Sequence, residues 1–464
     1  MLKRRVSEDE MDGLTVAAAQ RCVIAAMKTL ETERVPLQQA LGRVLAEDIV
    51  ANRDQPPYDV SAMDGFALRS ADLTTAPATL EIIEDIKAGD MPKHTIQPGQ
   101  CARIMTGAPV PPGADAVIRV EDTEALSERQ VQINVTVKAR NDIRDRGENM
   151  TCGEVVLSRD TSITPGVIGM LAMVKQAEVP VYRQPRVAIL STGDELEGLD
   201  EPLDPLKIPD ANSYALMAQV QALGMAPVLL GIARDDPDDL RAALQRGLQF
   251  DVLLVSGGTS VGVHDYVRPT LEALGVQMQF WRVAMKPGHP MAFGIAPSSE
   301  KSKAAEADAV QGATRAATQA YLVDRQGGEH GATPQCAAFD TFVFGIPGNP
   351  VSSMVCFEEF IGPALRKLMG HTRLFRQTVT ATLAREVKHR HRRTEFVRVM
   401  LARQGEAWAA TPTGNQGSGI LRSMAMAEGL MVVPAQSGDV AAGAIVQVQL
   451  LDGMDVQAEV GGEW

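Results

Sequence analysis

The chain has 464 residues, 45% of them hydrophobic, and a formal net charge of -13 at pH 7. This length indicates roughly three globular domains, and the acidic balance, with no basic stretch to offset it, argues against nucleic acid as a partner. No apolar run is long enough to cross a membrane, and the polar start lacks the apolar region of a secretory signal, so we expect a cytoplasmic protein. The five cysteines are odd in number and far apart, which fits neither a disulfide framework nor a zinc site.

The N-terminal segment has helical patterns. Thr15 can cap a helix that runs through Met27. Pro36 stands at the start of a second pattern, and a third covers residues 167–174. We therefore expect residues 1–52 and 149–182 to form a helical support domain. The apolar stripe of the second pattern, at helical spacing, is Leu37, Ala40, Leu41, Val44 and Leu45.

Between residues 53 and 148 the pattern changes to short apolar runs punctuated by Pro and Gly. Such runs are typical of strands. The sequence therefore predicts a separate, mostly β module inserted into the helical one. Its expected strands are residues 79–86, 101–105, 116–120 and 131–137.

Strands and helices alternate between residues 183 and 375, which predicts a doubly wound α/β domain. A stretch at about 296–340, rich in Ala, Gly, Ser, Gln and charge, buries little apolar area, so we expect a surface insertion there. The expected strands are residues 187–190, 227–230, 252–255 and 342–346, and the expected helices lie near 213–223, after Pro237, after Asp265 and over 351–369.

Residues 376–464 alternate short apolar runs with turns, which predicts a C-terminal β-barrel. The whole chain is thus expected to be an α/β multidomain protein. The expected barrel strands are residues 378–383, 396–401, 408–412, 429–434 and 445–450.

Five loops dense in Gly, Pro, Ser and Asp begin or end apolar runs. Glycine allows close approach of a ligand to the backbone, and Ser, Thr and Asp supply hydroxyl and carboxylate groups, so such loops suit anions and hard metal ions. A single such loop is more often a plain turn, but five together indicate one composite site. The loops are DVSAMDG (59–65), TGAPVPPGAD (106–115), STGDEL (191–196), SGGTSVG (256–262) and GIPGNPVS (345–352).

Ten motifs, in the same order and over nearly the whole chain, resemble molybdopterin molybdenumtransferases, the family of bacterial MoeA and the gephyrin E domain. The resemblance implies an elongated homodimer with a shared active site. It also implies a reaction in which adenylylated molybdopterin and molybdate give molybdenum cofactor and AMP, with a divalent metal such as Mg2+. The motifs are DVSAMDGFAL, RIMTGAPVPPGADAVI, RDRGENM, STGDEL, RDDP, SGGTSVGVHDY, MKPGHPMAFG, GIPGNPVSSMVCF, RRTEFVR and GNQGSG.

Breaking a phosphoanhydride calls for hard cations held by carboxylates and for basic groups that stabilise the leaving phosphate. Glu195, Asp235 and Asp265 follow expected strands of the α/β domain, so we expect them to hold one metal ion. Lys286 and Arg282, four residues apart, are expected to hold phosphate oxygens or molybdate.

The resemblance adds residues from other domains. It implies that Asp59 and Thr106 reach the site of the dimer partner, and that Arg393 and Ser418 belong to the site from the last domain. The expected substrate-binding loop residues are Ser191, Thr192, Gly193, Ser256, Gly257, Gly258, Ser260, Pro347, Gly348, Asn349 and Pro350.

Several residues depart from the family pattern. Asn149 replaces a usual acid, Arg282 a usual lysine, and His289 another lysine. His264 and Glu428 also stand where other residues are common. These changes indicate an oxyanion pocket with altered charge.

Three other functions would share some features of this sequence. A non-catalytic scaffold of the gephyrin E type would share the fold, but the acids and Lys286 are present. A molybdopterin adenylyltransferase would lack the other modules, and it is also a possible partner, as are molybdoenzyme maturation proteins. An oxidoreductase predicts GxGxxG after a strand, and the sequence has none there.

Overall fold

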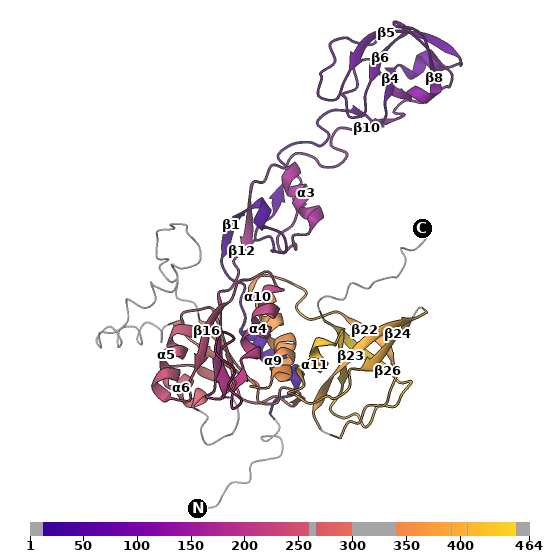
Figure 1. Ribbon diagram of the computed structural model, residues 1–464. Helices are drawn as coiled ribbons and strands as arrows, with labels where there is room; N and C mark the ends of the chain where they lie inside the picture. Colours follow the sequence, from indigo (N-terminus) through magenta and orange to yellow (C-terminus); the bar gives the residue numbers. More distant parts are fainter. Residues whose placement is uncertain (1–12, 259–265, 299–339, 391, 406, 452–464) are drawn as a thin grey trace, which may run out of the picture. The chain divides into compact units, whose positions relative to one another are not determined.

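Figure 1 shows the computed structural model, which describes residues 13–258, 266–298, 340–390, 392–405 and 407–451. Contacts between Cα atoms divide the chain into two compact units. One comprises the residues up to Thr32 together with those from Tyr182 onward, and the other comprises Glu33–Val181. Ser260, His264, Asp265 and nearly all of the expected insertion lie outside the described residues.

The helix expected near the N-terminus is confirmed as α2 (Val16–Ala26), where the Thr15 hydroxyl accepts a hydrogen bond from Ala18 N at 3.2 Å. Its buried face packs in one core with β13 (Val187–Thr192) and with the helix α10 (Gly362–Leu368). We expected this helix in the support domain, but its apolar face is buried against the α/β sheet instead.

The helix expected after Pro36 is wrong. Only a three-residue 3-10 turn forms, η1 (Leu37–Gln39). Gly42 has a φ of +77°, which ends any helix. The following Val44 and Leu45 are then fully buried in extended backbone, bridged to Ser162 and Val181. Val44 and Leu45 of the apolar stripe are therefore buried on the two sides of an extended segment, whereas Leu41 is exposed.

The region of the second unit that corresponds to the expected support domain contains only a few other elements. Two short strand pairs flank the helix α3, whose Thr164 cap and Pro165 are as expected for a helix start. The elements are β1 (Thr32–Pro36) paired with β12 (Glu178–Tyr182), β2 (Ile49–Val50) with β11 (Val155–Leu157), and α3 (Pro165–Met173).

The mostly β module of the second unit is a six-stranded sheet in the order β7-β4-β6-β5-β9-β8. Its two faces bury separate apolar clusters. All four strands expected here are present. The elements are β3 (Val60–Ser61), β4 (Gly65–Leu68), η2 (Ser70–Leu73), β5 (Ala78–Ile86), β6 (Gln100–Ile104), β7 (Ala116–Arg119), η3 (Val120–Asp122), β8 (Thr123–Ser127), β9 (Gln130–Ile133) and β10 (Ile143–Arg144), which pairs with β3.

The first unit contains the expected α/β domain, with a six-stranded sheet in the order β16-β13-β17-β21-β20-β18. The first four strands are parallel to one another, and the last two pairings, of β21 with β20 and of β20 with β18, are antiparallel. The antiparallel edge was not expected from the sequence. The strands are β13, β16 (Val228–Ala233), β17 (Val252–Ser256), β18 (Gln277–Phe280), β20 (Ala292–Ala296) and β21 (Thr341–Ile346), beside the short parallel pair β14 (Leu196–Glu197) and β15 (Ile208–Pro209).

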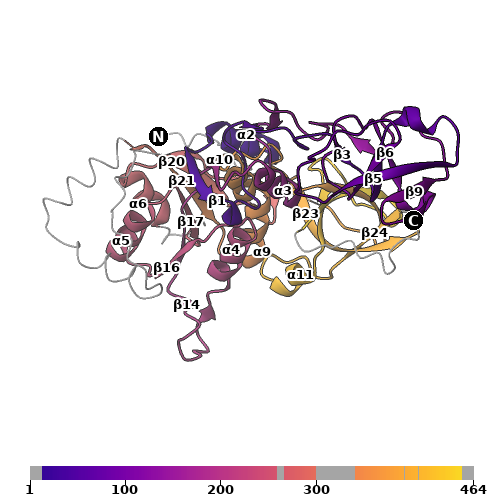
Figure 2. The same ribbon diagram turned by 90° about the horizontal axis from the view of Figure 1, so that it is seen from above.

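Helices cover both faces of this sheet, as Figure 2 shows. Helices α5 and α6 pack on one face, and α2, α4, α9 and α10 pack on the other. The central parallel strands are buried on both sides, which explains their continuous apolar sequences. The helices are α4 (Ala211–Gln221), α5 (Pro237–Gly247), α6 (Val267–Ala273), α9 (Pro350–Cys356) and α10, with a π-helical turn η4 (Phe357–Ile361) between the last two.

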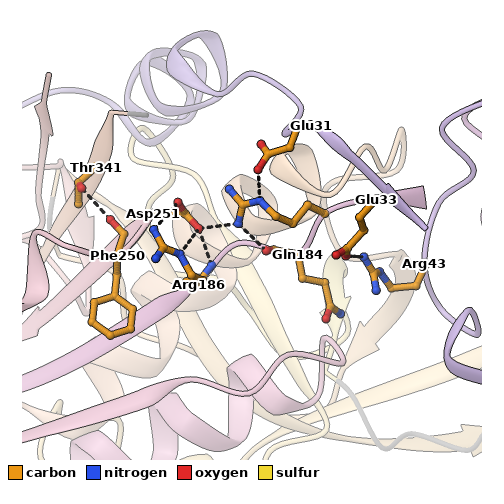
Figure 3. Close-up of polar contacts among 9 residues, drawn as sticks. Glu31, Glu33, Arg43, Gln184, Arg186, Phe250, Asp251 and Thr341 are labelled. Carbon is orange, nitrogen blue, oxygen red and sulfur yellow. Dashed lines mark hydrogen bonds and ion pairs between the residues drawn. The ribbon is translucent and has the colours of Figure 1, made fainter. Parts of the chain in front are cut away.

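A polar cluster anchors the start of β17 (Figure 3). Asp251 accepts hydrogen bonds from Arg183 Nη1 and from Arg186 N, each at 2.7 Å. Arg183 also binds Glu31, and the Thr341 hydroxyl donates to the Phe250 carbonyl oxygen at 2.7 Å. Burial alone would raise the pKa of Asp251, but these arginine contacts outweigh it and lower the pKa. The cluster therefore fixes a charged carboxylate at the amino end of β17.

The expected C-terminal barrel is confirmed, because the order β23-β24-β22-β26-β25 closes through pairing of β25 with β23. All five strands lie where the sequence predicts them. A short strand from the α/β sequence, β19 (Met285–Lys286), joins this sheet in parallel with β23. The barrel elements are β22 (Thr378–Leu383), β23 (Thr394–Gln404), β24 (Ala407–Pro412), α11 (Leu421–Ala425), β25 (Gly429–Val433) and β26 (Ile445–Leu450).

Among the helices of the described ranges, none is long and apolar enough to cross a membrane.

Candidate functional site

The candidate site lies at the carboxyl ends of the parallel strands β13, β17 and β21. After β13 the chain forms β16, which lies beside one edge of β13, and then β17, which lies beside its other edge. In open α/β sheets, ligands bind at such a point, outside the carboxyl ends of the strands. Three of the five expected loops, at 191–196, 256–262 and 345–352, begin at this edge.

At this edge the backbone of Gly257 and Gly258 lies in close contact with Thr192. A Cβ atom at Gly257 would lie 2.5 Å from the Thr192 carbonyl oxygen, and one at Gly258 would lie 3.1 Å from the Thr192 hydroxyl. Both glycines have positive φ values. The Thr192 hydroxyl is buried and has no hydrogen-bond partner among the described residues. A polar group is thus kept beside two positions where only glycine fits.

The loop after β21 is joined to this edge by Asn212, a residue that the sequence did not single out. Its Nδ2 donates to the Ser256 hydroxyl at 2.8 Å and to the Gly348 carbonyl oxygen at 2.7 Å. Asn212 lies in the first turn of α4, two residues after the Asp210 cap. Its amide therefore holds the Ser256 and Pro347–Asn349 loops together.

Ser191 is engaged within the fold. Its hydroxyl lies in the core, 3.0 Å from Asp210 Oδ1 and 2.9 Å from the Ser213 hydroxyl. Asp210 also accepts the Ser213 main-chain N–H, so the three residues cap α4. Ser191 thus positions the start of a helix at the site.

The barrel reaches the same edge through Ser418. Asn349 Nδ2 donates to the Ser418 hydroxyl at 3.0 Å, and Val351 N donates to the Ser418 carbonyl oxygen at 3.2 Å. The loop that carries Ser418 is held from behind by the buried Arg398, which donates to the Gly417 carbonyl oxygen at 3.2 Å. The structure therefore brings the GNPV and GNQGSG motifs together, as the resemblance implies.

Lys286 lies on β19 and forms an ion pair with Glu395 on β23, with Nζ and Oε1 2.9 Å apart. The sequence did not single out Glu395. Arg282 is half-buried just before this strand, and its carbonyl oxygen accepts the Leu14 N–H at 3.1 Å. Arg393 directly precedes β23, and its carbonyl oxygen lies 3.0 Å from His389 Nε2.

Two of the three expected metal ligands are described. Glu195 folds over Gly193, because a Cβ atom at Gly193 would lie 2.4 Å from a Glu195 carboxylate oxygen. Asp235 follows the neighbouring strand β16, and its N–H donates to Asp194 Oδ1 at 3.3 Å. Within the described ranges, no group of three metal-ligating side chains is assembled, and Asp265 lies outside them. The hard oxygen donors nevertheless suit Mg2+.

In the second unit, Asp59 is fixed as a charged carboxylate. Its Oδ1 accepts the Arg146 main-chain N–H at 2.9 Å, and its Oδ2 accepts Arg140 Nη1 at 2.7 Å. These bonds, with the Arg146 bond as the larger cause, lower the pKa of Asp59. Val110 N donates to the Asp59 carbonyl oxygen at 2.9 Å, so the two expected loops of this unit lie together.

Thr106 is fixed by Asp64, which the sequence did not single out as a site residue. Asp64 Oδ1 accepts the Thr106 main-chain N–H at 2.7 Å and the Thr106 hydroxyl at 2.8 Å. These two bonds lower the pKa of Asp64. The oxygen of Thr106 therefore keeps its lone pairs for a donor or a metal ion.

Three of the departures from the family pattern have local structural roles. Asn149 Nδ2 donates to Met173 Sδ at 3.2 Å, and a carboxylate has no such donor. His289 Nδ1 lies 2.7 Å from the Val283 carbonyl oxygen. Glu428 Oε2 accepts the Leu401 N–H at 2.6 Å within the barrel.

Family models and full-length relatives identify the chain. Residues 14–174 match the MoeA N-terminal region (domain I and II), 188–367 a probable molybdopterin binding domain, and 380–451 the MoeA C-terminal region (domain IV). The molybdopterin molybdenumtransferase of Bacillus subtilis is 33% identical over 97% of this chain and 96% of its own length. The chain belongs to the molybdopterin molybdenumtransferase family.

Further members of the molybdopterin molybdenumtransferase family also match this chain over nearly its whole length. Molybdopterin molybdenumtransferase 2 of Mycobacterium tuberculosis is 35% identical over 94% of this chain and 98% of its own length. The crystal structure of the molybdopterin biosynthesis MoeA protein of Pyrococcus horikoshii covers 94% of this chain and 100% of its own, with a TM-score of 0.73 and 27% identity. The family, the multidomain α/β fold and the transferase class expected from the sequence are confirmed.

Proposed function

We propose that this chain inserts molybdenum into molybdopterin, using molybdate and adenylylated molybdopterin as substrates and releasing AMP with the help of Mg2+. The observation that carries the proposal is the meeting of the Thr192, Ser256, Gly348 and Ser418 loops at one edge of the sheet. Hydroxyl and amide donors gathered there suit an organic phosphate and a tetrahedral oxyanion.

Each described group has a role that follows from its contacts. The Thr192 hydroxyl, buried without a partner among the described residues, donates to a phosphate oxygen of the substrate. Asn212 keeps two of the loops in place for the pterin phosphate. Lys286, directed by its ion pair, stabilises negative charge on molybdate or on the departing phosphate.

Glu195 and Asp235, with Asp265, would hold Mg2+ through their carboxylate oxygens. The cation would neutralise charge on the phosphoanhydride oxygens. The chain's own contribution is to keep the Glu195 carboxylate folded over Gly193, where a larger residue would displace it.

We further propose a cytoplasmic homodimer with shared active sites, in which Asp59 and Thr106 act on the partner's α/β domain. The support for a role in the reaction is that both residues are held by dedicated hydrogen bonds on adjacent loops. The domain bounds 53–148, 183–375 and 376–464 are kept as proposals, whereas residues 13–32 are assigned to the core of the α/β domain and not to the support domain of 1–52 and 149–182.

A turnover assay tests the reaction. Purified protein, adenylylated molybdopterin, molybdate and Mg2+ should yield AMP, and the yield should fall when Mg2+ is chelated. Tungstate in place of molybdate shows which oxyanion is preferred. A folded protein that releases no AMP with either oxyanion would refute the proposal and favour a scaffold of the gephyrin E type.

A heterodimer tests the shared site. Differently tagged Asp59→Asn and Lys286→Ala chains are co-expressed and the mixed dimer is purified. One of its two sites then combines an intact Asp59 with an intact Lys286, so about half of the wild-type activity should return. Each parental homodimer is the control. A mixed dimer no more active than either parental homodimer would show that Asp59 acts within its own chain.

A further inference from the structure

Lys286 and Glu395 are distant in sequence but lie side by side on neighbouring strands. Lys286 is on β19, and its register partner on the parallel strand β23 is Glu395. The ammonium and the carboxylate are 2.9 Å apart. The barrel thus supplies a carboxylate to a lysine that belongs by sequence to the α/β domain.

The two side chains differ in exposure. The Glu395 side chain is 6% exposed and the Lys286 side chain 39%. The carboxylate is therefore the inner member of the pair and the ammonium the outer one. An ammonium has three N–H donors and can bind a carboxylate and an oxyanion at the same time. The buried acid consequently limits where the lysine nitrogen can meet an anion.

Stability alone does not explain a charged acid at this position. The second carboxylate oxygen of Glu395, Oε2, is buried and has no hydrogen-bond partner among the described residues. An unpaired buried acceptor destabilises the folded state. An apolar side chain of similar size would avoid that loss, so the buried carboxylate calls for an explanation other than stability.

Glu395 also interacts with the cation that holds the Ser418 loop. Burial lowers the pKa of Arg398 to about 10, and the charge of Glu395 opposes this effect. Arg398 in turn donates to the Gly417 carbonyl oxygen and, at 3.1 Å, to the Ser423 hydroxyl. One carboxylate is therefore coupled to Lys286 and to the support of Ser418.

We propose that Glu395 is a positioning residue that holds the Lys286 ammonium at a fixed place for the oxyanion. The inference rests on the proposed function for its effect on turnover. Because the ammonium remains when Glu395 is neutralised, molybdate is still attracted, but the nitrogen is no longer fixed relative to the reacting phosphate. Loss of Glu395 should therefore lower kcat far more than it changes KM.

Kinetics of Glu395→Gln test this directly. We expect kcat to fall about tenfold or more, with the KM for molybdate within about threefold of wild type. Glu395→Asp, which keeps the carboxylate, should recover part of kcat. The matched control is Glu358→Gln, since the Glu358 side chain is also only 5% exposed and its carboxylate forms an ion pair with Arg376 at 2.7 Å. Equal losses in both glutamine variants would overturn the proposal.

A double-mutant cycle separates positioning from a general structural effect. If Glu395 acts through Lys286, then Glu395→Gln should lower kcat no further in a Lys286→Ala background. The double variant also removes both charges of the pair, so it remains available if Glu395→Gln alone fails to fold. An additional loss of kcat in the Lys286→Ala background, as large as in wild type, would contradict the proposal.

Chemical labelling supplies a readout that needs no turnover. Limited reaction with acetic anhydride, followed by mass spectrometry, gives the relative reactivity of each lysine. Because the ion pair engages the amine, Lys286 should react several-fold faster in Glu395→Gln and at the wild-type rate in Glu358→Gln. Unchanged labelling in Glu395→Gln would refute the positioning role. Labelling as expected without AMP release would refute the proposed function alone.

Discussion

Replacing Glu359 by glutamine should change how the stability of the first unit depends on pH. Glu359 lies on the π-helical turn η4 and is 3% exposed. Gln20 of α2 donates to its Oε2 at 3.0 Å, and Gln449 of the barrel strand β26 also bonds to it. The acid therefore lies where α2, the π turn and the barrel meet.

Burial raises the pKa of Glu359 from 4.5 to about 8, and the charge of neighbouring Glu358 adds to the rise against the bonds from Gln449 and Gln20. Between pH 4.5 and 8 the folded state keeps a proton that the unfolded state releases. Stability from this group is thus complete below pH 4.5 and is lost as the pH rises to about 8. At about 1.4 kcal/mol per pH unit, the loss is at most about 5 kcal/mol.

Guanidinium unfolding of wild type and Glu359→Gln, measured between about pH 5 and pH 8, checks this. The stability of wild type relative to the variant should fall by several kcal/mol across that range, because the neutral amide has no proton to lose. Glu128→Gln, at an exposed acid, is the control and should leave the slope unchanged. Parallel pH dependences for wild type and Glu359→Gln would refute the reasoning.

Three other substitutions have distinct expected outcomes. Thr192→Val should leave the melting temperature nearly unchanged, since the hydroxyl has no partner among the described residues, but calorimetry should show weaker binding of adenylylated molybdopterin. Gly257→Ala should destabilise by about 1–3 kcal/mol, because its Cβ would lie 2.5 Å from the Thr192 carbonyl oxygen, whereas Gly89→Ala, with a similar φ but open space, should cost less in a parallel melt. Asp251→Asn should destabilise at neutral pH through the loss of charge opposite Arg183. Because the pKa of Asp251 in the folded state is lowered from 3.8, the difference in stability from wild type should shrink as the pH falls below 3.8 and vanish only below that lowered pKa. A difference that persists in acid would contradict this account.

The strands were largely predictable from the sequence because their signal is local. The apolar run at Val252–Ser256 and the alternating Thr378–Leu383 are each bounded by turn residues, and both form strands at those positions. The segment after Pro36 was not, because helical spacing of apolar residues also suits an extended segment buried on both sides. Only the bridges of Val44 and Leu45 to distant residues decide between the two.

The site was predictable where a residue type carries the signal and not where a contact does. Thr192 and Gly257 stand in loops whose composition indicated a ligand, and Ser418 was implied by the family resemblance. Asn212 and Glu395 lie inside a helix and a strand, where a polar residue is ordinarily solvent-exposed. Their roles depend on which strand or loop the fold places beside them, and no local feature of the sequence indicates which one that is.

The pairing of β19 with β23 bears on any attempt to recombine segments between relatives. A chimera that exchanges everything after residue 375 would pair the Lys286 strand of one parent with the β23 of another. The residue opposite the lysine would then come from a different parent than the lysine itself. The apolar face of α2 raises the same difficulty for a fragment that begins at residue 183, which would leave part of its own core uncovered. The units that can be inherited intact are therefore discontinuous in sequence, and a successful crossover has to keep residues 13–32 with the α/β domain and residues 283–289 with the barrel.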